Sequence, residues 1–459
     1  MKAAVIGRPV SHSLSPAIFK FLRARELSPL EYEAREVSVE SLAIFIQGLR
    51  EDSEWRGVNV TIPHKESVLC LLDQVEADAA SLGAVNVIQR RNGKLQGFNT
   101  DIIGIEKTFH YAGFSVRGKN CFVLGAGGSA KAVLHVLGES GAKEVVVYNP
   151  RSERGHAVVE KFSALFPETS FSLASSVQEQ SEKTFSLVIN ATPVGMNIQT
   201  PEFFAPLAYL RTTNDSLAFD LIYTPKDTLF LKATRACGMR GVGGLGMLVD
   251  QAIATWELWV GTLRDLDRTR GELLQYLNGI LNLRENSRPV FLTGFMGVGK
   301  STIAHELCKV TGRRFFDTDR VIENRAKLSI AEIFAQQGEA AFREQEKTLI
   351  AELSSDKGAV IALGGGVLNQ IENLKRIKDA GLLVYLTATD ETLNQRLDKG
   401  ARTRPLLADL DPEAKKSKIA ELLKTRRPIY EQAHLSVPVD GLSPAEAVEK
   451  ILLALGAAR

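Results

Sequence analysis

The pattern of apolar and polar residues predicts three α/β blocks along the chain. In residues 1–100, short β-branched runs such as AAVIG, YEAREVSV and GVNVTIP alternate with stretches such as AIFKFLRARE and ESLAIFIQGLR. The runs predict strands, and the stretches, which carry apolar residues at three-to-four spacing, predict helices. This alternation indicates an α/β unit.

A second block begins at Asn120. The predicted strand CFVL leads through GAGGSA into the predicted helix KAVLHVLGES, and EVVVYN returns as a strand. FSLVINAT and SLAFDLIY predict further strands, and residues 246–282 predict one or two helices. The order of strand, glycine turn, helix and strand again indicates an α/β unit.

A third block follows a short polar segment. No pattern persists across ENSRP, residues 285–289, which contains a proline and predicts a domain boundary. From Val290 we expect the strand VFLTG, a loop GFMGVGKS, a helix from Ser301, and the later strands AVIALGG and LLVYLTA among helices.

Composition narrows the class of protein. A chain of 459 residues exceeds what one core organises, and roughly 100 to 200 residues per domain predicts three domains. With 44% hydrophobic residues, 24% charged residues and a net charge of +2, the chain has no basic excess that would indicate nucleic acid or membrane. Its four cysteines form no C-x-x-C pair, and nowhere do 18 apolar residues follow one another. We therefore expect a soluble, unprocessed cytoplasmic protein without zinc or disulfides.

The stretch GFMGVGKS, residues 294–301, has the form G-x-x-x-x-G-K-[ST]. Such loops turn tightly at glycines, aim backbone N–H groups at phosphate oxygens and lead into a helix N-terminus. Lys300 is placed to reach the β and γ phosphates, and Ser301 to offer a hydroxyl to Mg²⁺. The loop lies between a predicted strand and a predicted helix, so it predicts a nucleotide site.

Several polar residues follow this loop. Asp317 and Asp319 in FFDTD alternate along what reads as a strand end, where they suit a Mg²⁺ contact and a hydroxyl acceptor. The same D-x-D can be a solvated turn. Arg343, Arg404 and Arg426 are each, taken alone, the kind of residue that is usually surface charge.

Together these motifs resemble shikimate kinase. GFMGVGKS, FFDTDRVIE, SIAEIFAQQGEAAFREQE, GGGV, RTRPLL and RRPIY occur in the family's order from about Val290 to the end. The resemblance implies that Lys300 and Asp319 are catalytic, that Ser301 and Asp317 serve Mg²⁺, and that Arg404 belongs to a lid at about residues 399–413. It further implies that shikimate is held by Asp319, Arg343, Gly364, Gly365, Gly366 and Arg426, and ATP by Gly294, Gly297, Gly299, Lys300, Ser301, Thr302, Arg396 and Arg404, with Arg396 packed against adenine.

The glycine turn GAGGSA is a shortened dinucleotide signature, although many α/β proteins carry such a turn structurally. The next predicted strand ends in YNPRSER. There, NAD enzymes place an acidic residue and NADP enzymes an arginine. Asn149, Arg151 and Arg154 occupy that place with no carboxylate at the strand end, which favours NADP over NAD.

The first block carries the polar motifs SHSLSP, NVTIPHKE, GAVNV and GFNTDI. Ser13 and Ser15 are two hydroxyls on one loop, either a carboxylate site or a helix cap. Lys65 and Asp101 are a candidate pair, because a ketone under reduction needs a proton donor and a lysine beside an aspartate can supply one. A lysine followed by glutamate is otherwise usually a solvated face.

Residues 1–282 resemble shikimate dehydrogenase in SLSP, NVTIPHK, AVNV, NTD, GAGGSA, NATPVGM and GLGMLVDQA, although the family's N-R-T run reads N-P-R-S here. The resemblance implies Lys65 and Asp101 as the catalytic pair. The substrate residues it implies are Ser13, Ser15, Asn59, Thr61, Asn86, Asp101, Tyr223 and Gln251. The NADP residues it implies are Gly125, Ala126, Gly127, Gly128, Ser129, Asn149, Arg151, Arg154, Thr192, Met196, Gly244 and Met247.

The two resemblances imply a bifunctional enzyme of aromatic amino acid biosynthesis. NADPH would reduce 3-dehydroshikimate to shikimate, and MgATP would phosphorylate shikimate to shikimate 3-phosphate. We expect α/β folds throughout: a substrate-binding part (1–102 and about 245–284) around a Rossmann part (103–244), a linker (285–289) and a P-loop kinase domain (290–459). Alternatives are that only the kinase half is active, that the chain is a non-catalytic metabolite sensor, or that the first half also oxidises quinate. Small-molecule substrates, and neither nucleic acid nor membrane, are the expected partners, and the sequence leaves the oligomeric state open.

Overall fold

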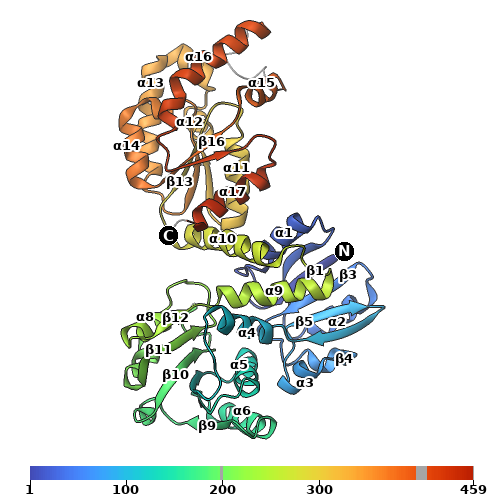
Figure 1. The fold of residues 1–459 in the computed structure, drawn as a ribbon. Coiled ribbons are helices and arrows are strands. Elements are labelled where there is room, and N and C mark those ends of the chain that lie inside the picture. The colour runs from blue at the N-terminus through green and yellow to red at the C-terminus, as the bar shows by residue number, and fades with distance from the viewer. Residues whose placement is uncertain (197–199, 400–410, 458–459) are drawn as a thin grey trace. The chain divides into compact units, whose positions relative to one another are not determined.

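The computed structural model describes residues 1–196, 200–399 and 411–457, and the chain divides into two compact units, Met1–Leu274 and Gln275–Arg459 (Figure 1). Both units are built from sheets covered by helices, which confirms the predicted α/β folds. No helix in the described part of the chain is long and apolar enough to cross a membrane.

The first lobe of unit 1 contains a mixed six-stranded sheet in the order β2-β1-β3-β5-β6-β4. β1 pairs in parallel with β2 and β3, whereas β5 and β6 form an antiparallel hairpin that turns at Asn92 and Gly93, both with positive φ. An Asn-Gly pair adopts this turn readily. The elements are β1 (Lys2–Gly7), α1 (Ser15–Glu26), β2 (Glu31–Glu36), α2 (Leu42–Glu51), β3 (Trp55–Val60), β4 (Gln74–Val75), α3 (Ala77–Leu82), β5 (Val87–Arg91), β6 (Lys94–Phe98) and α4 (Asp101–Tyr111).

The second lobe of unit 1 contains six parallel strands in the order β12-β11-β10-β7-β8-β9. Read from β9, this is the doubly wound order of dinucleotide-binding sheets. The lobe comprises β7 (Asn120–Leu124), α5 (Gly128–Glu139), β8 (Glu144–Tyr148), α6 (Ser152–Leu165), β9 (Ser170–Ala174), β10 (Thr184–Asn190), α7 (Pro201–Phe204), β11 (Arg211–Asp220), α8 (Leu229–Ala236) and β12 (Arg240–Val242). β7 and β10 are buried almost throughout because helices cover both faces, which explains their continuous apolar runs.

Residues 246–282, predicted as one or two helices, lie in two: α9 (Leu245–Trp259) and α10 (Leu266–Glu285). The division between the units falls inside α10, on the N-terminal side of the predicted boundary at residues 285–289. In unit 2, the later turns of α10 approach α17 (Pro444–Ala457) closely, since a Cβ on Gly279 would lie 2.1 Å from the carbonyl oxygen of Leu452. Only residues 286–289 separate α10 from the next strand.

Unit 2 is built on five parallel strands in the order β14-β15-β13-β16-β17. Its remaining elements are β13 (Val290–Thr293), α11 (Lys300–Thr311), β14 (Arg314–Asp317), α12 (Thr318–Ala326), α13 (Ile330–Leu353), β15 (Ala359–Ala362), α14 (Ile371–Ala380), β16 (Leu382–Thr387), α15 (Asp390–Lys399), α16 (Pro412–Tyr430), β17 (Leu435–Pro438) and α17 (Pro444–Ala457). The central strand β13 is fully buried and ends at the predicted phosphate loop. In α13 the helix is interrupted at Gly338, whose φ is 83°.

Candidate active sites

Lys65 and Asp101, 36 residues apart, lie together in unit 1. Lys65 follows β3, and Asp101 is the first residue of α4. The Lys65 Nζ donates to Asp101 Oδ2 at 2.5 Å, and the Nδ2 of Asn86 donates to the other oxygen, Oδ1, at 2.8 Å. Both side chains of the ion pair are nearly buried (13% and 8% exposed), so water screens their charges poorly. The pair can hold a proton in a fixed position.

A chain of hydrogen bonds extends from this pair into the substrate lobe. The Asn86 Nδ2 also donates to the hydroxyl of Thr100, which lies 3.3 Å from the hydroxyl of Thr255. The Asn59 Nδ2 donates to the Thr255 hydroxyl at 3.3 Å. The network therefore joins two predicted substrate residues, Asn59 and Asn86, to the candidate catalytic pair.

Tyr32, a residue that the sequence analysis missed, also belongs to this network. Its hydroxyl donates to Asn59 Oδ1 at 2.7 Å, and its ring stacks on Phe19 with centroids 4.0 Å apart. Desolvation in the protein interior raises the pKa of Tyr32 well above its ordinary value, so the phenol stays protonated and remains a donor. No sequence motif marks Tyr32 or Thr255, whereas Thr100 stands directly before Asp101 in the NTD motif.

The other predicted substrate residues of unit 1 lie on neighbouring elements. Ser13 and Ser15 stand at the start of α1, where Leu14 occupies the N-cap position without a side-chain cap bond. The backbone N of Ser15 donates to Ser13 Oγ at 3.2 Å. Thr61 packs on the end of β1, because a Cβ on Gly7 would lie 2.5 Å from its methyl carbon. Gln251 on α9 accepts from the Thr100 hydroxyl at 3.4 Å.

The glycine turn after β7 leaves its backbone open. Gly125 has a φ of 112°, and a Cβ on it would lie 3.0 Å from the carbonyl oxygen of Ala191. Gly127 is the N-cap of α5, and a Cβ there would meet nothing within 4 Å. The N-terminal N–H groups of α5 and this open approach suit a pyrophosphate group. Ala126 lies within this turn, Gly128 begins α5, and the hydroxyl of Ser129 lies 3.4 Å from Lys65 Nζ.

Two arginines follow β8, where sequence reasoning favoured NADP. The Asn149 Nδ2 donates to the carbonyl oxygen of Arg151 at 2.7 Å and holds the turn that the N-P-R-S run makes before α6. Arg151 is the N-cap residue of α6 and Arg154 lies in its first turn, both exposed. Neither guanidinium has a carboxylate partner among the described residues. They are the groups in this turn that fit a 2′-phosphate.

Of the remaining predicted cofactor residues, Thr192 and Met196 lie in the loop after β10, whereas Gly244 is the N-cap residue of α9 and Met247 lies in that helix. Thr192 donates its hydroxyl to Asn190 Oδ1 at 2.7 Å, and Met196 is 43% exposed. A Cβ on Gly244 would lie 2.1 Å from the carbonyl oxygen of Leu221, so only glycine fits there. The predicted substrate residue Tyr223 is half-buried in the loop after β11, and the predicted cofactor residue Met247 is buried in α9 against Gly104.

In unit 2, a cavity of about 760 Å³ joins the phosphate loop to the predicted shikimate residues. Gly294, Gly297 and Gly299 all have positive φ, as a tight phosphate loop requires. The Lys300 Nζ donates to the carbonyl oxygen of Gly294 at 2.8 Å. Ser301 Oγ donates to Asp317 Oδ2 at 2.5 Å, and Thr302 lines the same cavity. This loop fits a nucleotide triphosphate, and the Ser301 and Asp317 oxygens fit Mg²⁺, which takes few protein ligands.

The sequence predicted that both Asp317 and Asp319 lie at a strand end. The structure places only Asp317 there. Asp317 ends β14 and caps α12 by accepting from the backbone N of Arg320 at 3.3 Å, whereas Asp319 lies in the first turn of α12. Burial, with the nearby Asp317 charge, raises the pKa of Asp319 to about 6, although Lys300 and Arg343 oppose the shift. Asp319 can therefore exchange a proton near neutral pH.

The three predicted shikimate-binding side chains pack directly against three consecutive glycines after β15. A Cβ on Gly364 would lie 2.2 Å from Asp319 Oδ1, one on Gly365 3.0 Å from an Arg426 amino nitrogen, and one on Gly366 2.7 Å from an Arg343 amino nitrogen. Tyr430, which the sequence analysis missed, donates its hydroxyl to the carbonyl oxygen of Gly365 at 3.0 Å. Two guanidiniums and one carboxylate thus converge over one backbone segment, an arrangement suited to a hydroxylated acid.

Arg343 is held by two glutamates. Its Nη1 donates to Glu346 at 2.5 Å and its Nη2 to Glu339 at 3.0 Å, and Glu346 is only 2% exposed. Glu346 was not predicted, although it stands one helical turn after Arg343. Arg396 donates to the carbonyl oxygen of Val298 in the phosphate loop at 2.8 Å. Arg404, with most of the predicted lid, lies outside the described residues.

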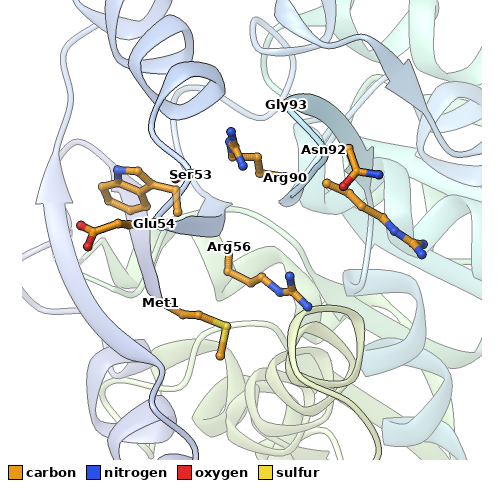
Figure 2. A pocket seen from close by; sticks show the side chains of 9 residues that line it. Met1, Ser53, Glu54, Arg56, Arg90, Asn92 and Gly93 are labelled. Atoms are coloured by element: carbon orange, nitrogen blue, oxygen red, sulfur yellow. The ribbon is translucent and has the colours of Figure 1, made fainter.

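Another hollow, of about 380 Å³, lies in unit 1 at the start of β3 and the end of β5. Figure 2 shows that the guanidinium groups of Arg56 and Arg90, which line it, point in different directions. The Nε of Arg56 donates to the carbonyl oxygen of Trp259 at 2.7 Å. The Nε of Arg90 donates to the carbonyl oxygen of Arg50 at 3.1 Å. These arginines do not converge on a common point, and the groups described above lie at the other ends of the strands.

The folds and sites define a dinucleotide-dependent oxidoreductase unit followed by a P-loop phosphotransferase unit. Residues 5–88 match the family model of the shikimate dehydrogenase substrate binding domain, and residues 296–456 match that of shikimate kinase. A shikimate dehydrogenase (NADP(+)) of Caldanaerobacter subterraneus subsp. tengcongensis is 35% identical over 274 residues, which are 59% of this chain and 96% of that protein. This chain belongs to the shikimate dehydrogenase family and also carries a shikimate kinase domain.

Solved structures agree with this assignment. The shikimate 5-dehydrogenase of Thermus thermophilus, in complex with NADP(H) and shikimate, covers 59% of this chain and 97% of its own at 33% identity and a TM-score of 0.51. A chorismate mutase/shikimate 5-dehydrogenase fusion protein from Clostridium acetobutylicum covers 61% of this chain and 98% of its own at 31% identity and a TM-score of 0.53. In that second protein, too, the dehydrogenase shares a chain with another enzyme.

Proposed function

We propose that this chain catalyses two successive reactions of the shikimate pathway. Unit 1 reduces 3-dehydroshikimate to shikimate with NADPH, and unit 2 transfers the γ-phosphoryl group of MgATP to shikimate. The observation that carries the proposal is the buried Lys65–Asp101 pair, 2.5 Å apart, in a chain that also places Asp319, Arg343 and Arg426 around a phosphate-loop cavity. We place the dehydrogenase at residues 1–284, the linker at 285–289 and the kinase at 290–459, in a cytoplasmic protein.

In the dehydrogenase reaction, Lys65 donates a proton to the carbonyl oxygen of the substrate while Asp101 holds the lysine in place. NADPH, when bound, supplies the hydride. Asn59 and Asn86, held by Tyr32 and by the threonine network, are proposed to orient the ring hydroxyls. Because Tyr32 donates to Asn59 Oδ1, the amide of Asn59 presents N–H donors rather than an acceptor to its other neighbours.

In the kinase reaction, Asp319 accepts the proton of the shikimate hydroxyl that attacks phosphorus. Lys300 neutralises charge on the transferred group, since phosphoryl transfer depends on positioning and charge compensation more than on covalent chemistry. Arg343 and Arg426 are proposed to bind the substrate carboxylate. Ser301 and Asp317 would hold Mg²⁺, and Arg396 lies beside the loop that would bind the nucleotide.

A coupled turnover of the full-length chain tests the proposal. With 3-dehydroshikimate, NADPH and MgATP, we expect NADPH oxidation and ADP release together. Lys65→Ala should abolish the first signal while added shikimate is still phosphorylated, and Lys300→Ala should abolish ADP release while shikimate still accumulates. If the wild-type chain oxidises no NADPH but phosphorylates added shikimate, only the kinase half is active; if neither signal appears, the chain is a metabolite-binding module.

A further inference from the structure

The first unit contains a buried carboxylate, Asp220, that lies outside the residues proposed to contact substrate and cofactor. Asp220 and Asn190 are register partners at the carboxyl ends of β11 and β10, and both are 0% exposed. The loops that follow these two strands carry Thr192 and Tyr223, which are proposed to border the cofactor and the substrate. In doubly wound sheets, ligands bind at the carboxyl ends of the strands.

Asp220 joins these two loops. Its Oδ1 accepts from the Nδ2 of Asn190 and from the backbone N of Ile222, both at 3.0 Å. Its Oδ2 accepts from the Thr228 hydroxyl at 2.6 Å. Asn190 in turn accepts, through its Oδ1, from the backbone N of Thr192 at 3.1 Å and from the Thr192 hydroxyl at 2.7 Å. Two buried side chains therefore connect one loop to the other.

The ionised carboxyl is unfavourable for folding. Burial raises the pKa of Asp220 to about 6, and the hydrogen bonds from Thr228, Ile222 and Asn190 offset only part of this shift. No lysine, arginine or histidine in the described residues forms an ion pair with it. Since the folded state favours the protonated form, the charge lowers the free energy of unfolding above that pKa. Buried ionisable groups of this kind are typical of functional sites.

We infer that Asp220 is a positioning residue of the dehydrogenase, which fixes the Thr192 loop and the Tyr223 loop relative to each other through Asn190 and Thr228. The inference rests on the proposed dehydrogenase function. A carboxylate suits this place because both oxygens accept hydrogen bonds. An asparagine has one acceptor oxygen and would turn an N–H group toward one set of donors.

The test is Asp220→Asn in the full-length chain. We expect kcat for NADPH oxidation to fall at least tenfold, while KM for 3-dehydroshikimate changes less than threefold, because the residue acts on the alignment of the reacting groups and touches neither ligand. Thr228→Val should show the same split and Thr228→Ser should retain activity, since serine keeps the hydroxyl. This second pair tests the inference even if Asp220→Asn fails to fold.

The matched control is Ser216→Ala on the same strand. Ser216 is 0% exposed and donates to the carbonyl oxygen of Phe185 at 2.9 Å, far along β11 from the two loops. The Ser216→Ala variant should have a lower unfolding temperature than the wild type and an unchanged kcat for NADPH oxidation. The inference is overturned if Asp220→Asn keeps kcat within twofold of wild type, or if Ser216→Ala loses as much. A wild-type chain that oxidises no NADPH overturns the proposed function, and this inference with it.

Discussion

At the scale of single residues, the two proposed reactions rest on aspartates in different surroundings. Each carboxylate oxygen of Asp101 accepts a hydrogen bond, one from Lys65 and the other from Asn86. Asp319 is instead left with a pKa of about 6, because burial and Asp317 outweigh the attraction of Lys300 and Arg343. A carboxylate that must accept a proton works best with a pKa near the working pH.

We therefore predict that the kinase loses activity as the pH falls through about 6. Above that pH Asp319 is ionised and can accept the hydroxyl proton; below it, the protonated form cannot. The measurement is kcat/KM for shikimate between pH 5 and 8 at saturating MgATP, with ADP release as the signal. Asp319→Asn should lower kcat by a factor of about 10² to 10⁴.

The same titration has a signed effect on stability. The folded-state pKa of Asp319 lies above the value of about 3.9 for an unfolded aspartate. Its contribution to stability is therefore complete below about pH 4 and is lost as the pH rises through 6. Asp319→Asn should flatten the pH dependence of kcat/KM and that of the free energy of unfolding. If the loss of activity at acid pH persists unchanged in this variant, another group causes it.

At the scale of elements, the segment after β15 works as a platform on which three side chains meet. Gly364, Gly365 and Gly366 lie under Asp319, Arg426 and Arg343 respectively. None of the three glycines has a positive φ, so backbone conformation does not require them. Their common property is the space that a missing Cβ leaves for the charged groups above.

This arrangement predicts a graded effect of alanine along the platform. The built Cβ is closest to its neighbour at Gly364 (2.2 Å), next at Gly366 (2.7 Å) and farthest at Gly365 (3.0 Å). We expect KM for shikimate to rise in that order, Gly364→Ala most, and by tenfold or more for Gly366→Ala, which corresponds to about 1.4 kcal/mol. Initial rates against shikimate concentration give the order.

Two internal controls accompany the alanine series. KM for ATP and the NADPH oxidation of the same chain should not change, because the platform touches neither site. Arg343 has little room to yield at Gly366, since Glu346 beneath it is 2% exposed. A Gly365→Ala variant as impaired as Gly364→Ala would contradict the steric explanation.

The sequence predicts local geometry better than it predicts contacts between residues that are far apart along the chain. The phosphate loop and the glycine turn could be predicted because their function lies in consecutive backbone groups. Tyr32 and Thr255 could not, since their place in the network depends on how β2 pairs with β1 beside β3 and on how α9 packs against β3. Asp319 was placed at a strand end because sequence periodicity does not reveal that Asp317 caps α12.

At the scale of the whole molecule, two enzymes share one chain, and the product of the first is the substrate of the second. The division between the two units falls inside α10, and only residues 286–289 separate that helix from β13, the central strand of unit 2. A short tether raises the concentration of one site near the other. We predict kinetic coupling between the two reactions without a sealed tunnel.

The test adds an excess of a full-length Lys65→Ala/Lys300→Ala variant to the wild-type chain during coupled turnover. This variant is inactive in both reactions but keeps Asp319, Arg343 and Arg426, so it binds shikimate that escapes into solution. With coupling, it should intercept less than half of the intermediate, and ADP release should follow NADPH oxidation with little lag. The control is the same variant with Arg426→Ala added, which should bind no shikimate at its kinase site and therefore shows how much the dehydrogenase site alone intercepts. If the trap instead captures shikimate in proportion to its share of all kinase sites, free diffusion carries the intermediate, and placing both enzymes on one chain gives no kinetic advantage.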